Sequence, residues 1–347
     1  MLDVVTAASL DPWELLGLER HWLETVGARA TAPVLLIYSL AGRLISVGRY
    51  HLYGGAPERE GIGAMRRLSG GRVLGAGEGW LGIALVLPTR TALLPERDAH
   101  IRPEQSMNRY ARGVLGGLRA LGIDGFYPGR DAITFKQREL AMCTMEQDAS
   151  GAMLFEAIVA VNRGMEEVVH DLERLDPPGA LPCPLYTPDS ATRLVRELDR
   201  DLSFDEVAAA LKEGYRELLG EIRERQLDPA ELTHAAHRGR ALLSSGWLAL
   251  SAGPADFNRA ARAATQLGAM EAKLSVTGDN KIERALISGD LIANSSGLAD
   301  FERGLIGRPH DLTAVSQAVM RTYGDGRNFI LGIGELANLA RLITRAQ

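Results

Sequence analysis

Apolar residues near the start of the chain recur at helical spacing. Leu15, Leu18 and Trp22 fall on one side of a helix with 3.6 residues per turn. Residues 11–26 are therefore predicted to form a helix with one buried face. Asp11 suits the N-cap, and Pro12 suits the first helical position, where its missing N–H costs nothing.

Short aliphatic runs bounded by glycine and polar residues predict strands. The clearest run covers residues 80–87 (WLGIALVL) and is apolar enough to be a buried strand. The other predicted strands cover 33–40, 44–47, 132–135, 139–144, 153–161, 269–276 and 282–287, and a Gly278-Asp279-Asn280 turn joins the last two. Helices are predicted over 103–121, 165–175, 203–225, 298–305, 311–322 and 334–344. Runs of strands with helices between them favour an α+β fold, with mixed sheets flanked by helices.

Length and composition are those of a globular protein with room for two domains. The 347 residues are 46% hydrophobic and 24% charged. We place a boundary between about residues 226 and 260, so the expected units are residues 1–240 and a small α+β domain over 255–347.

Charge and apolar patterning exclude several classes of partner. The net charge is −5 and no basic stripe is visible, so no nucleic acid is expected as a partner. No apolar stretch approaches the roughly 20 residues that span a bilayer, and the acidic N-terminus is unlike a secretory signal. The two cysteines lack a CxxC spacing, which fits a reducing compartment. The expectation is a soluble cytoplasmic protein.

Residues 66–72 (RRLSGGR) carry the strongest candidate chemistry. Gly70 and Gly71 have no Cβ, so backbone N–H groups there can approach an anion closely. The neighbouring arginines offer planar forks of donors suited to phosphate or carboxylate. The segment predicts an anion-binding turn at the edge of a sheet.

This turn resembles the RRxSGG or RRxTGGR signature of the biotin/lipoate protein ligase family, which includes the octanoyltransferases. The order of further motifs is most similar to bacterial lipoate-protein ligases with an accessory C-terminal domain. These motifs are Glu19 in the opening helix, Gly48-Arg49, Pro128-Gly129-Arg130-Asp131, Pro188-Asp189-Ser190-Ala191-Thr192, Gly246-Trp247, residues 254–257, Gly268 and Ile287-Ser288-Gly289-Asp290.

The resemblance implies an acyl-transfer chemistry. In the family, ATP activates lipoate or octanoate as an acyl-adenylate, so ATP with magnesium and one of these acids are the implied cofactor and ligand. The acyl group then passes to a lysine of a lipoyl carrier domain, either a glycine-cleavage H-type protein or a dehydrogenase E2-type domain. The residues implied in holding the adenylate or acyl carboxyl are Arg67, Ser69, Gly70, Gly71, Arg72, Arg130 and Asp131. Val73, Leu74 and the strand at 80–87 are implied as the lining of an acyl tunnel.

One departure from the family falls on its most important cation. The family's R-K-x-x-G strand reads Arg138-Glu139-Leu140-Ala141-Met142 here, so Glu139 occupies the lysine position. Transition-state charge at the acyl carbonyl needs a nearby cation. Lys136 or Arg138 is the expected substitute, although strand alternation puts both on the face opposite to Glu139.

Four further positions also differ from the residues that the family has there. Ala76-Gly77, Trp80, Asp131 and Phe155-Glu156 stand where the family has polar donors or small residues. Together with Glu139 they indicate either a changed ligand or a lost adenylation step.

Cysteine and histidine offer weaker candidates. Cys183, in Leu181-Pro182-Cys183-Pro184, resembles the nucleophilic Pro-Cys of octanoyltransferases, with a buried thiol as the ordinary alternative. Cys143 is expected in the core. His234 and His237 have i,i+3 spacing but no third ligand, so no metal site is expected.

Three hypotheses remain from the sequence. The first is a ligase or transferase that handles a lipoyl or octanoyl group for a carrier lysine. The second is a non-catalytic paralogue that binds the acyl ligand or the carrier as an accessory subunit. The third is acyl transfer through Cys183.

Overall fold

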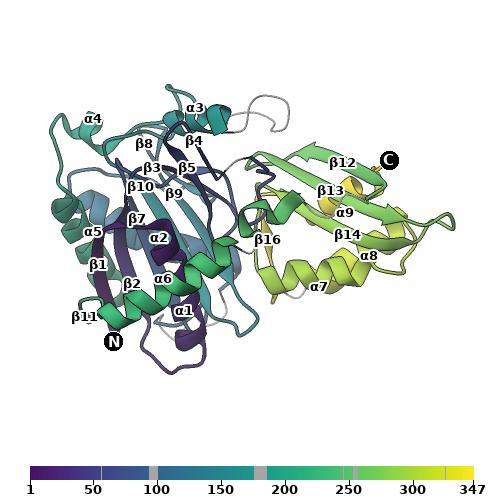
Figure 1. Cartoon of the computed structure of the whole chain (residues 1–347), viewed down its shortest axis with the longest axis horizontal. Coiled ribbons are helices and arrows are strands. Elements are labelled where there is room, and N and C mark those ends of the chain that lie inside the picture. Colours follow the sequence, from purple (N-terminus) through teal and green to yellow (C-terminus); the bar gives the residue numbers. More distant parts are fainter. Residues whose placement is uncertain (56, 94–100, 176–185, 245, 253–256, 325) are drawn as a thin grey trace.

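A seven-stranded sheet forms the centre of the larger part of the molecule (Figure 1). The computed structural model describes residues 1–55, 57–93, 101–175, 186–244, 246–252, 257–324 and 326–347. The strand order is β11 (Ile222–Glu224), β1 (Leu2–Leu10), β2 (Val34–Leu40), β7 (Trp80–Leu87), β10 (Met153–Ala160), β9 (Arg138–Gln147) and β8 (Ala132–Phe135). The pairs on either side of β1 are parallel, and the pairs from β2 to β8 are antiparallel.

Both faces of this sheet are buried. Every residue of β7 and β10 is buried, as the continuous apolar sequence of β7 predicts. Leu35 and Ile37 of β2 belong to one apolar cluster, whereas Val34 and Leu36 belong to the other. This alternation follows from the period of two along a strand.

Helices cover the two faces in pairs. On one face, α1 (Pro12–Gly27) lies beside α6 (Pro229–Ser244), where a Cβ on Gly17 would stand 1.8 Å from the carbonyl oxygen of Ala235 (Figure 1). On the other face, α2 (Pro103–Ala120) lies against α5 (Phe204–Leu219). Two further helices are α3 (Glu166–Leu175) and α4 (Leu194–Leu198).

A second, smaller sheet carries the arginine–glycine turn. Its order is β4 (Glu58–Arg59), β5 (Ile62–Arg66), β3 (Arg43–Val47) and β6 (Leu74–Gly75), so residues 67–73 connect β5 to β6. The short helix η2 (Trp247–Ala252) lies against β5. The turn is therefore held between the edge of this sheet and neighbouring segments.

The C-terminal elements form their own sheet and core (Figure 1). The strands are β12 (Arg259–Ala264), β13 (Ala269–Val276) and β14 (Ile282–Gly289), followed by the ribbon of β15 (Ile292–Ala293) and β16 (Ile330–Leu331). The helices are α7 (Ser295–Leu305), α8 (Leu312–Tyr323) and α9 (Leu336–Thr344). The sequence-based division at 1–240 and 255–347 stays a prediction. The elements from β12 to α9 all lie within its second unit.

The predicted α+β class with mixed sheets is confirmed. Several elements were not predicted, namely β1, β4, β5, β6, β11, β12, β15, β16, α4, α6 and η2. One predicted element was too long, because α5 ends at Leu219, and Gly220 follows with a φ of 86°. None of the helices in the described ranges is long and apolar enough to cross a membrane.

Arg66 has a structural role, because its buried side chain bonds several backbone carbonyl groups. Its guanidinium is fully buried and donates to the carbonyl oxygens of Gly48, Arg49, His51, Tyr53 and Leu248, at 2.7–3.0 Å. These bonds fix the segment after β3 and tie η2 to β5. Burial, with the nearby Arg67, lowers the pKa of Arg66 to about 10, so it stays charged at neutral pH.

We expect Arg66→Ala to destabilise the protein by at least ~3 kcal/mol, because several buried carbonyls lose their donor. Denaturant unfolding measures the effect. Arg20→Ala is the matched control, since Arg20 pairs with Glu24 on the exposed face of α1 and should cost less than ~0.5 kcal/mol. Equal destabilisation by the two variants would contradict this role of Arg66.

Candidate functional site

Arg67 organises the turn from inside. Its side chain is buried and donates to the carbonyl oxygens of Ser46, Gly70 and Arg72, at 2.9, 2.6 and 2.8 Å, and to Ser69 Oγ at 3.3 Å. These bonds wrap the turn around the guanidinium. Arg67 was predicted to hold a ligand anion, but its donors are directed at the protein backbone.

The glycine pair faces the C-terminal part of the chain. The Gly71 N–H donates to the carbonyl oxygen of Leu291 at 2.7 Å, and Gly71 has a φ of 91°. A Cβ on Gly70 would stand 2.2 Å from the same carbonyl oxygen. Thr144 Oγ1 donates to Gly70 O at 2.8 Å. In this arrangement the segment around Leu291 covers the turn, and the Gly71 N–H is used within the protein.

Arg72 occupies the charged centre of the site. It bonds Asp131 through Nε and Nη2, at 2.7 and 3.1 Å, and Glu139 through Nη2 at 2.9 Å. The guanidinium also stacks on the ring of Tyr186, 4.8 Å from its centroid, and the Tyr186 hydroxyl donates to Val73 O. Burial raises the pKa of Glu139 and Arg72 opposes that rise. The carboxylate at the family's lysine position is thus compensated by the arginine of the turn.

Lys136 and Arg138 lie away from this centre. Lys136 Nζ is 3.1 Å from Glu197 Oε2, and Arg138 Nη2 is 2.6 Å from Glu197 Oε1 on α4. Both side chains reach Glu197, but the expected strand alternation does not extend to Lys136, because Lys136 and Gln137 form the turn between β8 and β9 with positive φ. Their role as substitutes for the family's lysine stays a prediction. To reach the site, either side chain would have to break its ion pair with Glu197.

A pair of buried carboxyl groups lies beneath the turn. Glu19 on α1 and Glu156 on β10 are 0% and 3% exposed. Burial raises the pKa of both; Glu156 raises that of Glu19 further, and Arg67 lowers both. Ser69 and Glu19 both bond the Glu156 carboxyl. Two carboxyl groups in contact disfavour a second negative charge, so the pair retains a proton to a higher pH than two separate carboxyl groups would.

The sequence pointed to Glu19 and Glu156 separately and not as a pair. The signal was available in both elements. Glu156 is the single charged residue in the buried run MLFEAIVA, and Glu19 follows Leu15 by one helical turn. A charge inside an apolar run marks either a functional group or a buried network.

Glu156 lines a small enclosed cavity under the turn. The space available to the centre of a water-sized sphere is about 10 Å³, which holds about one water. The lining residues are Leu15, Tyr38, Leu40, Ser46, Met65, Arg67, Leu74, Ala76, Glu156 and Ile158. Leu74 is among these residues, whereas Val73 and β7 are not, and the strand residues of the lining come from β2, β3, β5, β6 and β10. The acyl-tunnel role of Val73, Leu74 and β7 stays a prediction.

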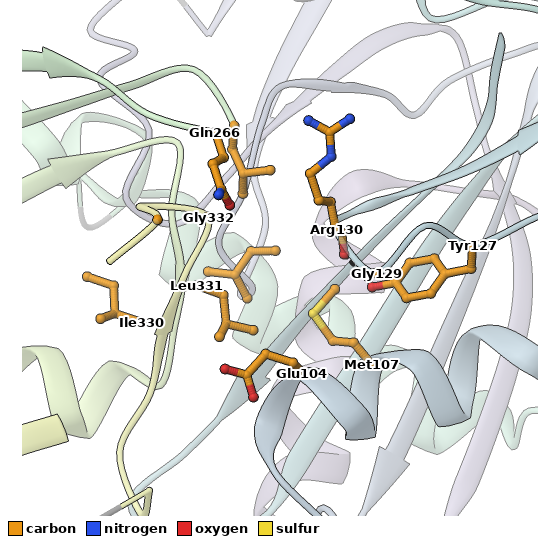
Figure 2. A pocket seen from close by; sticks show the side chains of 12 residues that line it. Glu104, Met107, Tyr127, Gly129, Arg130, Gln266, Ile330, Leu331 and Gly332 are labelled. Carbon is orange, nitrogen blue, oxygen red and sulfur yellow. Dashed lines mark hydrogen bonds between the residues drawn. The ribbon is translucent and has the colours of Figure 1, made fainter. Parts of the chain in front are cut away.

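A wider cleft of about 220 Å³ lies between the two parts of the chain (Figure 2). Met107, Leu267, Ile292 and Leu331 supply apolar walls from both sides. Arg130 is exposed at its rim, on the loop before β8, and the Tyr127 hydroxyl bonds the Arg130 carbonyl. Of the five cations predicted at the site, Arg130 alone has no bond to a protein acceptor among the contacts of the described residues.

The cysteine and histidine candidates have ordinary surroundings where the structure describes them. Cys143 is buried in β9, and burial raises the pKa of its thiol. Cys183 lies outside the described residues. His234 packs edge-on against His21, with ring centroids 5.4 Å apart. Across the described ranges, no group of three or more His, Cys, Asp or Glu side chains is arranged to hold a metal ion.

Comparisons with known proteins place this site in a family. Residues 11–216, more than half of the chain, match the model of the lipoyl protein ligase A/B catalytic domain. The chain therefore belongs to this family, and its function is of the lipoate-protein ligase and octanoyltransferase kind.

Individual relatives agree with this assignment. An octanoyltransferase LipM from Exiguobacterium sp. is 27% identical over 237 residues, covering 60% of this chain and 83% of the relative. The crystal structure of P. falciparum LipL1 in complex with lipoate covers 99% of this chain and 100% of its own, with a TM-score of 0.74 and 13% identity. A lipoate-protein ligase A bound with ATP covers 72% of this chain and 98% of its own, with a TM-score of 0.52 and 19% identity. At such identities these structures establish the fold alone.

Buried acids also lie where the two parts of the chain meet. Glu146 on β9 accepts from the Ser295 N–H at the start of α7, at 2.9 Å, and burial raises its pKa to about 7 against the opposing effect of Arg49. Burial likewise raises the pKa of Asp290 to about 7. His51 lies 3.4 Å from Asp290, but burial and the nearby arginines lower the pKa of His51 to about 3, so this contact is not an ion pair at neutral pH.

We expect Glu146 to make stability fall as the pH rises. A carboxyl whose pKa rises from about 4.5 unfolded to about 7 folded holds a proton that the unfolded chain has lost, so its contribution disappears between those values. The unfolding free energy of Glu146→Gln minus that of wild type should be roughly 2–3 kcal/mol larger at pH 8 than at pH 4.5. Any effect of the substitution that does not depend on pH cancels in this comparison. Urea unfolding at the two pH values measures this gain. A difference that does not vary with pH would contradict the prediction.

Proposed function

We propose that this chain holds an acyl group of the lipoyl or octanoyl kind beneath the arginine–glycine turn and passes it to a lysine of a lipoyl carrier domain. The observation that carries the proposal is the placement of the family's RRLSGGR turn over a cavity lined mainly by apolar side chains. Apolar lining suits a fatty-acid-like tail, because such a tail binds by leaving water.

Arg72 is the cation that this proposal assigns to the acyl carbonyl. It extends from the turn, next to the position where the family has its lysine, and its charge is permanent. As charge builds on the carbonyl oxygen, a guanidinium that exchanges Glu139 for that oxygen would stabilise it. Asp131 keeps Arg72 oriented through two bonds to one side of the guanidinium.

Four of the five predicted cations are bonded within the protein, so this conformation does not present them to a nucleoside triphosphate. Arg67, Arg72, Lys136 and Arg138 each bond protein acceptors, and Glu139 adds negative charge where phosphate would lie. We therefore derive no step through ATP, magnesium or an acyl-adenylate. An acyl group that arrives already activated, as a thioester, is the donor that this charge distribution favours, in keeping with the octanoyltransferase among the relatives.

The proposed acceptor is a lipoyl domain of the H-type or E2-type. An archaeal lipoate protein ligase from Thermoplasma acidophilum, with a TM-score of 0.51 to this chain, has been described together with its E2 lipoyl domain. This likeness supports the carrier as a partner without specifying which carrier this chain serves.

The test mixes the full chain with an apo lipoyl domain and measures the mass of the carrier. We expect acylation of its lysine with an octanoyl thioester donor, and a loss of at least tenfold in rate for Arg72→Ala, because the carbonyl loses its cation. Parallel reactions contain lipoate or octanoate with ATP and magnesium. Arg20→Ala, on the exposed face of α1, is the control for Arg72. No mass gain with any donor would end this proposal.

Glu139→Lys distinguishes a ligase that has lost its ATP-dependent activity through Glu139 from a transferase that takes an activated acyl donor. The variant places an ammonium where the family has its lysine. A ligase inactivated by Glu139 would gain at least tenfold in ATP-dependent acylation, whereas we expect no such gain from the proposed transferase, because it takes an activated donor. Glu139→Gln is the matched control, because it removes the negative charge without adding a cation. An equal rise in the two variants would show that only the negative charge obstructs the nucleotide.

A further inference from the structure

One face of the Arg72 guanidinium is covered by an aromatic ring. Arg72 Cζ lies 4.8 Å from the centroid of the Tyr186 ring, which is within the range of a cation–π contact. Both residues are buried, with 6% of each exposed. Cation–π attraction is larger in such a place than at the surface, because water does not compete for the charge.

Tyr186 is attached to the same stretch of backbone as the arginine that it covers. Its hydroxyl donates to the carbonyl oxygen of Val73 at 2.9 Å, and Val73 directly follows Arg72. Burial raises the pKa of this hydroxyl against the opposing effect of Arg72, so it stays a protonated donor at neutral pH. The hydroxyl therefore keeps the ring in place over the guanidinium.

The segment that follows Tyr186 is fixed beside Glu139, the acid that Arg72 bonds. The Glu139 N–H donates to Ser190 O at 2.7 Å, and the Thr192 N–H donates to Glu139 O at 2.9 Å. Residues 139 and 191 form a parallel bridge. One segment thus supplies the ring over Arg72 and holds the backbone of its acidic partner.

We infer that Tyr186 is a positioning residue for acyl transfer, because its ring keeps the Arg72 guanidinium in the plane in which it can bond the acyl carbonyl. The inference rests on the proposed function, which assigns Arg72 to that carbonyl. Tyr186 acts through Arg72 and makes no contact with the acyl group in this assignment.

The plane of the guanidinium decides which acceptor Arg72 can reach. All five N–H donors of an arginine lie in that plane. Asp131 is bonded by both Nε and Nη2, at 2.7 and 3.1 Å, whereas Glu139 is bonded by Nη2 alone, at 2.9 Å. When the carbonyl oxygen replaces Glu139, the bonds to Asp131 hold one edge of the group and leave it able to tilt about that edge. A ring stacked on one face resists this tilt, so the exchange of acceptors takes place in a fixed plane.

Kinetics of carrier acylation by the full chain, with an octanoyl thioester as donor, tests the inference. We expect Tyr186→Leu to lower kcat roughly tenfold and to change the KM for the donor by less than about twofold, because the ring supports an interaction made in the transition state. Tyr186→Phe retains the ring, so it should keep at least about half of the wild-type kcat. An equal loss in the Phe and Leu variants would assign the effect to the bond with Val73 and would overturn the inference.

A double variant shows whether Tyr186 acts through Arg72. In the Arg72→Ala background the ring has no guanidinium to hold, so adding Tyr186→Leu should lower kcat by less than about twofold further. Losses that multiply would show that the ring acts independently of Arg72, and the inference would then be rejected.

Tyr110→Leu is the matched control for the loss of a buried tyrosine. Tyr110 is also buried, its hydroxyl donates to the carbonyl oxygens of Arg90 and Ala92 at 2.9 and 3.0 Å, and its ring belongs to the apolar cluster on the other face of the sheet. Its folded fraction, measured by circular dichroism, should keep the kcat of wild type. A loss in this control equal to that in Tyr186→Leu would contradict a specific role for Tyr186.

A second variant covers the case in which Tyr186→Leu does not fold. Tyr186→Met supplies a longer, flexible apolar side chain that fills an irregular space, and it should show the same loss of roughly tenfold in kcat. Wild-type kcat in this variant would overturn the inference.

Failure of the inference and failure of the proposed function give different results. Carrier acylation that proceeds equally well in wild type and in the Tyr186 variants rejects the inference alone. A wild-type chain that acylates no carrier rejects the proposed function, and the inference is rejected with it.

Discussion

The site depends on one constraint, the burial of two adjacent arginines whose donors are satisfied by the backbone. Arg66 gathers carbonyls from the segment after β3 and from η2, and Arg67 gathers those of the turn itself. A buried guanidinium is tolerated only when nearly all its N–H groups have acceptors. The path of the chain around these two groups is therefore fixed, and the glycine pair, Arg72 and the cavity take their positions from it.

Charge compensation is the second theme of the site. Arg72 lies between Asp131 and Glu139, and Arg67 lies beside the Glu19–Glu156 pair, so these two buried cations have acidic neighbours, whereas Arg66 donates to backbone carbonyl groups. The replacement of the family's lysine by Glu139 is thus absorbed locally by the arginine of the turn. Such a network keeps the fold intact while it changes the sign of the charge that a ligand would meet at this position.

The sequence predicted the fold class and the elements with strong apolar periodicity, such as α1, β7 and the β13–β14 hairpin. It did not predict β1, whose residues LDVVTAASL are rich in alanine and polar residues and pair with β2 and β11 only in the folded chain. Residues 66–72 lie at the end of β5 and in the turn that follows it, but the direction of each guanidinium could not be read from the residue type. Burial decides that direction, and burial depends on segments such as 48–53 and η2 that are distant in sequence.

The bond from the Gly71 N–H to Leu291 O joins the turn to the C-terminal part of the chain. Any molecule that uses this N–H must first separate two segments that are more than two hundred residues apart in sequence. For such a molecule the observed association rate would saturate at the rate of separation as its concentration rises. Its residence time would depend on the same separation, because the segment around Leu291 covers the turn.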